Sequence, residues 1–175
     1  MASGSPPPVG QIMDDSRGAF DHPCPDCGAP LGGRAGCDQA FHALGARALE
    51  TPALAYRRRG VVDAYCLQHP AYLASLKSFA AHLCGLCASI EYANDARADR
   101  AIWSDLRLPP GATRPAVPPR RATVTVVAAY AAGDLRRFRD AVDTWLEGVW
   151  GAWAEHHSLA RQWLEYSMAA PRRRR

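Results

Sequence analysis

Three cysteines near the N-terminus constrain the fold most strongly, because their spacing is typical of a metal-binding turn. Cys24 and Cys27 are separated by two residues, Gly28 follows directly, and Cys37 comes after nine intervening residues. In a Cys-x2-Cys turn, backbone N–H groups point at both thiolates, and glycine tolerates the positive φ that this turn requires. We therefore predict a zinc knuckle in which the three cysteines supply three of the four ligands of a tetrahedral Zn²⁺.

The sequence does not decide which residue is the fourth ligand of this knuckle. His42 would complete a Cys3His set, while His69, His22 and a residue more distant in sequence are alternatives. Residues 21–45 are rich in glycine and have little periodicity, so metal binding would supply the energy that orders them. Two other interpretations are a redox dithiol and a set of free structural cysteines. The dithiol is disfavoured because no strand precedes Pro23.

Hydrophobic periodicity indicates that the rest of the chain is mainly helical. Apolar residues recur at spacings of three and four from Tyr72 to Ile90, and Pro70 suits the first position of this helix. A helix is also expected over residues 133–168, with Asp134 as its N-cap. A shorter helix is expected at residues 41–54, whereas the β-branched residues 123–127 form either a strand or the lead into a helix.

The predicted fold class is mainly α, a small helical bundle with an N-terminal Cys-rich zinc-knuckle segment. Each part of the chain has a composition of its own, which divides it into a disordered leader at 1–20, a single helical domain at 21–168 and a basic disordered tail at 169–175. Within the domain, 21–45 is the knuckle and 107–122 is a Pro-rich crossover.

Composition and charge exclude several classes of protein. With 48% hydrophobic and 22% charged residues, the chain is not wholly disordered. No apolar run is long enough to span a bilayer, and no secretory signal is recognisable, so we expect a cytoplasmic protein. The formal net charge of the chain is +4, and the four arginines at 172–175 contribute four positive charges. The rest of the chain is therefore close to neutral. We therefore do not expect nucleic-acid binding.

Three further cysteines form a second pattern. Cys66-x2-His69 and Cys84-x2-Cys87 have the spacing of two halves of a second zinc site. However, leucines interleave with Cys84 and Cys87 on the same helix, and free cysteine is among the most buried residue types. Core cysteines are therefore the favoured interpretation, and a second zinc site is the alternative.

Histidines on separate helices form a third candidate group. His69, His82 and either His156 or His157 would converge with Asp63 if the two long helices packed antiparallel. Such a set with an open position is typical of a catalytic metal. The alternative is that each histidine caps a helix or makes one buried hydrogen bond.

The sequence resembles an uncharacterised bacterial family, a domain of unknown function. The resemblance rests on Cys24-x2-Cys27-Gly28-Ala29 with Cys37, on the block Tyr65-Cys66-Leu67-Gln68-His69-Pro70, on the stretch from Ser75 to Cys87, and on Trp150-x2-Trp153-x2-His156-His157. It implies that the knuckle and the histidines are family features, and it favours His69 over His42 as the fourth ligand. It brings no established activity. A looser likeness to the DNA-damage-inducible four-helix metalloproteins lacks their His-x3-His signature and remains an analogy.

Two functions follow from these patterns. The first is a small cytoplasmic zinc-binding protein with a structural metal site, formed by Cys24, Cys27, Cys37 and either His69 or His42, that acts through an unknown ligand or protein partner. The alternative is a metal-dependent hydrolase or transferase, with Asp63, His82, His156 and His157 as candidate catalytic residues. The sequence leaves open whether the protein is an enzyme and whether it forms a homo-oligomer.

Overall fold

The computed structural model describes residues 22–51, 57–93, 95–115 and 124–170. Its elements are α1 (Gly33–Glu50), α2 (Arg58–Gln68), the 3-10 helix η2 (Pro70–Leu73), α3 (Leu76–Glu91), α4 (Ala96–Asp105), α5 (Val126–Tyr130), α6 (Leu135–Ala152), the 3-10 helix η3 (Ala154–His156) and α7 (His157–Ala169). These described stretches contain no strand, which confirms the mainly α fold. The predicted leader, residues 116–122 of the predicted crossover and residues 171–175 of the predicted tail lie outside them.

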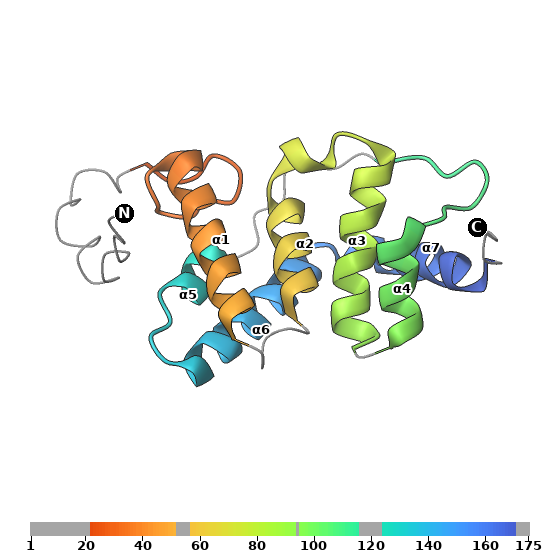
Figure 1. The fold of residues 1–175 in the computed structure, drawn as a ribbon. Helices are drawn as coiled ribbons and strands as arrows, with labels where there is room; N and C mark the ends of the chain where they lie inside the picture. The colour runs from red at the N-terminus through yellow and green to blue at the C-terminus, as the bar shows by residue number, and fades with distance from the viewer. Residues whose placement is uncertain (1–21, 52–56, 94, 116–123, 171–175) are drawn as a thin grey trace, which may run out of the picture.

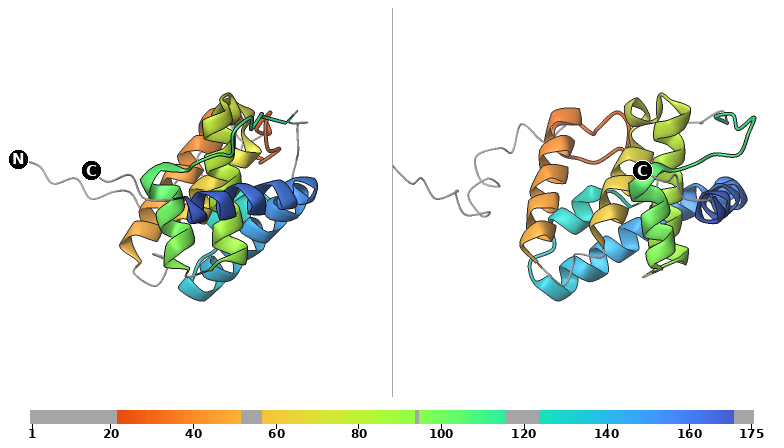
Figure 2. Two further views of the ribbon diagram at one scale, coloured as in Figure 1. Left: turned by 90° about the vertical axis from the view of Figure 1, so that its right-hand side faces the viewer. Right: turned by 45° about the vertical axis from the view of Figure 1, so that its right-hand side comes forward.

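The helices are arranged in a row and a crossing segment. Figure 1 shows α1, α2, α3 and α4 standing side by side, with α6 and α7 running across behind them. In this arrangement α6 packs on α2 and α3, and α7 packs on α3 and α4. The turned views in Figure 2 show the α6–α7 segment along one side of the row, while α5 fills the space between α1 and α6. No helix in the described part of the chain has the length and apolar character needed to cross a membrane.

The core lies between the row and the crossing segment. A stripe of apolar side chains on α6 faces this core, and its members Phe138, Val142, Trp145 and Val149 are all at most 1% exposed. Burying each of these side chains contributes roughly 1.5–3 kcal/mol. Trp145 Nε1 also donates a hydrogen bond to Gln68 Oε1 at 2.8 Å, which ties α6 to the end of α2. This contact holds in place the part of α2 that leads into His69.

Helix ends follow local capping chemistry. Asp134 accepts a hydrogen bond from the backbone N of Arg137 at 2.9 Å, which confirms the predicted N-cap of α6. Pro70 opens η2 instead of α3, because Ser75 caps α3 by accepting from the backbone N of Ser78. Residues 124–127 of the stretch 123–127 are described, and they form the lead into a helix and not a strand, since α5 begins at Val126.

The predicted boundaries of two helical stretches are wrong. α1 begins at Gly33, well before the expected start at residue 41, so Cys37 belongs to a helix and not to a loop. The stretch expected at 133–168 is interrupted after Ala152, where η3 separates α6 from α7. Periodicity did not register this break because the buried residues resume the same spacing on the other side of it.

Candidate metal centre

Cys24 and Cys27 lie in a tight turn before α1. The backbone N of Gly28 donates to the carbonyl of Cys24 at 2.8 Å, and the backbone N of Cys24 donates to the carbonyl of Ala29 at 2.8 Å. Gly28 has a φ of 81°, which lies in the left-handed region where a side chain would be strained. These bonds close the turn and bring both thiols to its inner side, where they are at most 2% exposed.

Cys37 reaches the same place from the first turns of α1. Gly32 and Gly33 both have positive φ and turn the chain sharply into the helix. A Cβ at Gly36 would overlap the carbonyl of Leu31, so the close return of the chain also depends on glycine. As a result Cys37 Sγ lies 3.6 Å from Cys27 Sγ and is fully buried.

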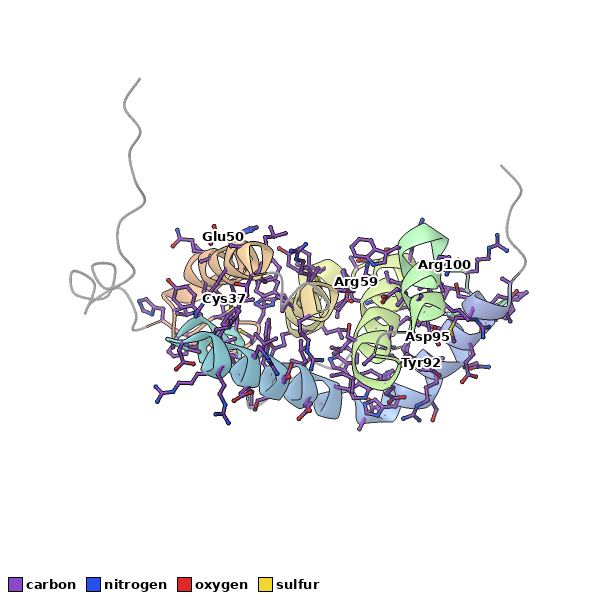
Figure 3. The ribbon with its side chains drawn as sticks, turned by 60° about the horizontal axis from the view of Figure 1, so that its bottom comes forward. Cys37, Glu50, Arg59, Tyr92, Asp95 and Arg100 are labelled. Atoms are coloured by element: carbon purple, nitrogen blue, oxygen red, sulfur yellow. The ribbon has the colours of Figure 1, made fainter. Side chains whose placement is uncertain are left out.

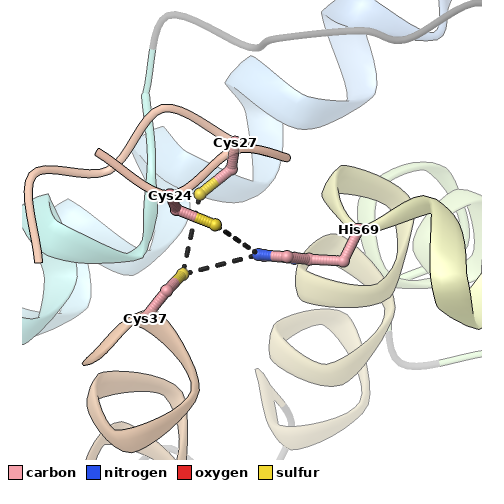
Figure 4. A group of neighbouring side chains, drawn as sticks. All are labelled: Cys24, Cys27, Cys37 and His69. Atoms are coloured by element: carbon pink, nitrogen blue, oxygen red, sulfur yellow. Dashed lines mark hydrogen bonds between the residues drawn. The ribbon is translucent and has the colours of Figure 1, made fainter. Parts of the chain in front are cut away.

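His69 completes the group from the end of α2. Its Nδ1 donates to the carbonyl of Tyr65 at 2.6 Å, and its ring stacks on that of Tyr65 with centroids 4.0 Å apart. The other ring nitrogen, Nε2, therefore faces the sulfurs, at 3.6 Å from Cys24 Sγ and 3.4 Å from Cys37 Sγ. All four donor atoms lie within 4.8 Å of one another. Figure 4 shows the four side chains pointing toward a common centre.

The electrostatics of the group favour a cation at its centre. A hydrogen bond from Cys37 lowers the pKa of Cys27 to about 4, against the effect of burial. The pKa of Cys37 is raised, because its thiol donates to Cys27 and its ionisation would place a second negative charge there. Thiolates and neutral imidazole are the forms that bind metals, and a cation removes the repulsion between the sulfurs. The four side chains therefore form a site that could hold a metal ion.

Tyr65 is the residue of this site that sequence reasoning missed. Its carbonyl sets which nitrogen of His69 faces the sulfurs, and its hydroxyl donates to Asp38 at 3.3 Å. A carbonyl acceptor behind a metal-binding histidine fixes the ring and its tautomer. The available signal was spacing, since Tyr65 lies four residues, about one helical turn, before His69, which follows the last residue of α2.

The structure does not bring His42 into the group. His42 is five residues beyond Cys37 on α1, which turns it by about 140° around the helix axis. Its side chain is 72% exposed, and Nε2 lies 3.5 Å from Asp38 Oδ2. His22 is also exposed, and its carbonyl accepts from the backbone N of Gly33. Of the candidate fourth ligands, His69 is the one beside the cysteines.

We expect His42→Gln to retain the full metal content of the wild-type protein and to change the free energy of unfolding by less than about 0.5 kcal/mol. The reason is that an exposed ion pair contributes little and that His42 does not reach the sulfurs. Elemental analysis and denaturant unfolding measure both quantities. Loss of metal from this variant would assign the fourth ligand to His42.

The remaining cysteines are core side chains. Cys66, Cys84 and Cys87 are at most 6% exposed, and Cys84 Sγ donates to the carbonyl of Ala160 at 3.7 Å. Burial raises the pKa of Cys66 and of Cys87 to about 12, so these thiols stay protonated. His69 Nε2 instead faces Cys24 and Cys37. Within the described residues no second group of donors that could hold a metal is found.

The candidate catalytic histidines do not converge. His69 belongs to the cysteine group, whereas His82 pairs with Asp63 through Nδ1 and Oδ1 at 2.9 Å. His156 packs against Phe79 and Trp153. The ring of His157 stacks on that of Trp150, with centroids 3.7 Å apart, and His157 Nε2 donates a hydrogen bond to the backbone carbonyl of Trp150. The predicted His-rich metal site is therefore not assembled, since His156 contacts Phe79 of α3 and His157 contacts Trp150 of α6.

Comparison with known sequences gives the family. The sequence model of a family described as a family of unknown function, DUF5946, matches residues 22–154. The chain belongs to DUF5946. The match contains Cys24, Cys27, Cys37 and His69, which we call the metal group, and it ends before His156 and His157. No curated protein and no solved structure matches the DUF5946 chain.

Proposed function

We propose that this DUF5946 protein binds one Zn²⁺ through Cys24, Cys27, Cys37 and His69. The observation that carries the proposal is the closeness of the four donor atoms, which all lie within 4.8 Å of one another. Three of their six separations are 3.6 Å for Cys27–Cys37, 3.6 Å for Cys24–His69 and 3.4 Å for Cys37–His69. A tetrahedral Zn²⁺ with sulfur at about 2.3 Å and nitrogen at about 2.0 Å requires about 3.8 and 3.5 Å. Three soft thiolates with one imidazole are also the donor set that suits zinc.

The role that we propose for this metal is structural. Three cysteines and one histidine fill all four positions of a tetrahedron, which leaves none open for a substrate or water. The four donors come from the N-terminal turn, α1 and the end of α2, so one ion would join three segments. The Arg34–Asp26 ion pair also links the turn to α1, but Arg34 is 59% exposed, so this pair contributes little.

We infer that the protein acts by binding a ligand or protein partner, not by metal-dependent turnover. Support comes from the closed donor set and from the separation of the histidines that an open metal site would need. A reducing compartment such as the cytoplasm fits this proposal, because all six cysteines are free and three must stay reduced to bind the metal.

Metal analysis of the purified chain tests the proposal. We expect one zinc per chain that survives mild chelation, and a Co²⁺-substituted protein with intense thiolate-to-metal charge-transfer absorption. Absence of both zinc and the cobalt signal would refute the metal centre. A second, exchangeable metal would instead favour the metal-dependent hydrolase or transferase.

A further inference from the structure

The thiols of Cys27 and Cys37 are in contact although they belong to different segments. Cys27 lies in the N-terminal turn and Cys37 in the first turns of α1, and their Sγ atoms are 3.6 Å apart. Figure 3 labels Cys37 on α1, at one end of the row, and Arg59 farther along the row on α2. The two sulfurs of a disulfide are about 2.05 Å apart, so an approach of about 1.5 Å separates this contact from a covalent bond.

Cys24 has a different neighbour in the same group. Its Sγ lies 3.6 Å from His69 Nε2. A bond between Cys27 and Cys37 would leave Cys24 and His69 as the two remaining donors, whereas a structural zinc ion needs four. The zinc-bound state and the Cys27–Cys37 disulfide are therefore mutually exclusive states of one set of side chains.

These two states connect the helices differently. A metal joins the N-terminal turn, α1 and the end of α2, whereas a Cys27–Cys37 disulfide joins the turn to α1 alone. His69 would keep its bond to the carbonyl of Tyr65 and lose its attachment to the other two segments. The stacking of Phe41 on Tyr65 would then remain as a contact between α1 and α2 near this point.

The core cysteines differ from the metal group in ionisation and not in burial. Cys66, Cys84 and Cys87 are at most 6% exposed, and the three cysteines of the metal group are at most 2% exposed. Burial raises the pKa of each core thiol, so these thiols are protonated. A metal-bound cysteine is a thiolate, which is the form that reacts with oxidants.

An oxidant would reach the metal group through the N-terminal turn. Pro23 and Pro25 of this turn are exposed, and the Arg34–Asp26 pair that links it to α1 is weak. Local opening of a surface segment costs less free energy than unfolding of the core. The core cysteines lack such a cover, because they lie on α2 and α3 within the packed helices.

We propose that the metal group is a redox switch, in which hydrogen peroxide joins Cys27 to Cys37 as a disulfide and releases the zinc ion. This inference rests on the proposed zinc site. One thiolate attacks a peroxide oxygen, so that an S–O bond forms, the O–O bond breaks and hydroxide leaves. The second thiolate attacks the resulting sulfenic sulfur, which forms the S–S bond and releases a second hydroxide. The two sulfurs lose two electrons, and the peroxide gains them.

Peroxide treatment of the zinc-loaded full chain tests the switch. We expect loss of the bound zinc, measured with a chromogenic chelator, and renewed zinc binding after reduction with dithiothreitol. Trypsin cleaves after Arg34, which separates peptide 18–34 with Cys24 and Cys27 from peptide 35–47 with Cys37. Mass spectrometry should find these two peptides cross-linked, with Cys24 still available to iodoacetamide.

Variants test the choice of sulfurs. Cys24→Ser and Cys27→Ser each remove one thiol of peptide 18–34 and one metal ligand, so they form a matched pair. After peroxide treatment, Cys24→Ser should retain the cross-link to peptide 35–47, and Cys27→Ser should lose it. Cys84→Ala, which changes a core cysteine, should release zinc as the wild-type chain does.

Three results would overturn the proposal. These are retention of zinc in peroxide, release of zinc without the Cys27–Cys37 disulfide, and oxidation of the core cysteines before zinc is lost. Each of them, observed on a chain that contained zinc at the start, leaves the zinc site intact. A chain without zinc before peroxide is added would instead refute the zinc site, and this inference with it.

Discussion

If the four donors bind a metal as we propose, replacing Cys27 with serine should abolish that binding and lower the free energy of unfolding by about 4 kcal/mol, when metal is present at about 1,000 times its dissociation constant. A serine hydroxyl does not ionise near neutral pH, so the site loses a thiolate that lies 3.6 Å from Cys37. Metal that binds only the folded chain contributes its binding free energy to folding. Elemental analysis and denaturant unfolding, each with and without added zinc, measure the two effects.

The matched control for this variant is Cys84→Ala. Cys84 is as deeply buried as Cys27 but lies on α3, where it contacts the carbonyl of Ala160. We expect this variant to keep its metal and to lose only about 1 kcal/mol of stability. A Cys27→Ser protein with unchanged metal content and unchanged unfolding would contradict the metal centre.

Replacing Gly85 with alanine should destabilise the protein by about 3 kcal/mol, although alanine is the better helix former. The new Cβ would occupy the space of the Asp63 carboxylate. The carboxyl group would have to move away from Arg59 and His82, which leaves this completely buried group without its two partners. Denaturant unfolding measures the loss, and the metal content should stay at the wild-type value because the metal group is separate.

Two glycines provide controls for the change at Gly85. Gly45 on α1 and Gly151 on α6 have no atom within 4 Å of an added Cβ. Alanine at either position should leave the protein unchanged or more stable by up to about 1 kcal/mol. In an Asp63→Ala background, Gly85→Ala should cost much less than in the wild type. An equal cost in both backgrounds would show that the overlap with Asp63 is not the cause.

Sequence patterns predicted the elements that depend on near neighbours in the chain. The turn at Cys24 and Cys27 needs only Gly28 and a few backbone bonds, so the pattern of residue types identifies it. The cap at Asp134 likewise depends on a backbone group three residues away. The apolar stripe of α6 is buried as its periodicity indicated.

The sequence left the fourth donor of the metal group open. On spacing alone His42 was the simplest choice, since it follows Cys37 closely. That choice fails because α1 begins at Gly33, so Cys37 and His42 lie on one helix and point in different directions. The resemblance to a family favoured His69, but its nearness to the sulfurs depends on how α2 packs beside α1.

The arrangement of the other histidines was also beyond the sequence. Whether His82, His156 and His157 meet depends on how α6 and α7 pack on α3, and the break between these two helices at η3 was not visible in the periodicity. Arg59, which lies four residues before Asp63, was not identified from spacing as a partner of that side chain.

By itself, then, the sequence determined a helical chain with a cysteine turn near its start, because both properties come from residues within a few positions of one another. Only the tertiary structure decided that His69 joins the cysteines, that Asp63 is buried between Arg59 and His82, and that the last two histidines pack among tryptophans. These outcomes depend on the relative placement of helices far apart in the chain, which packing across the whole core determines.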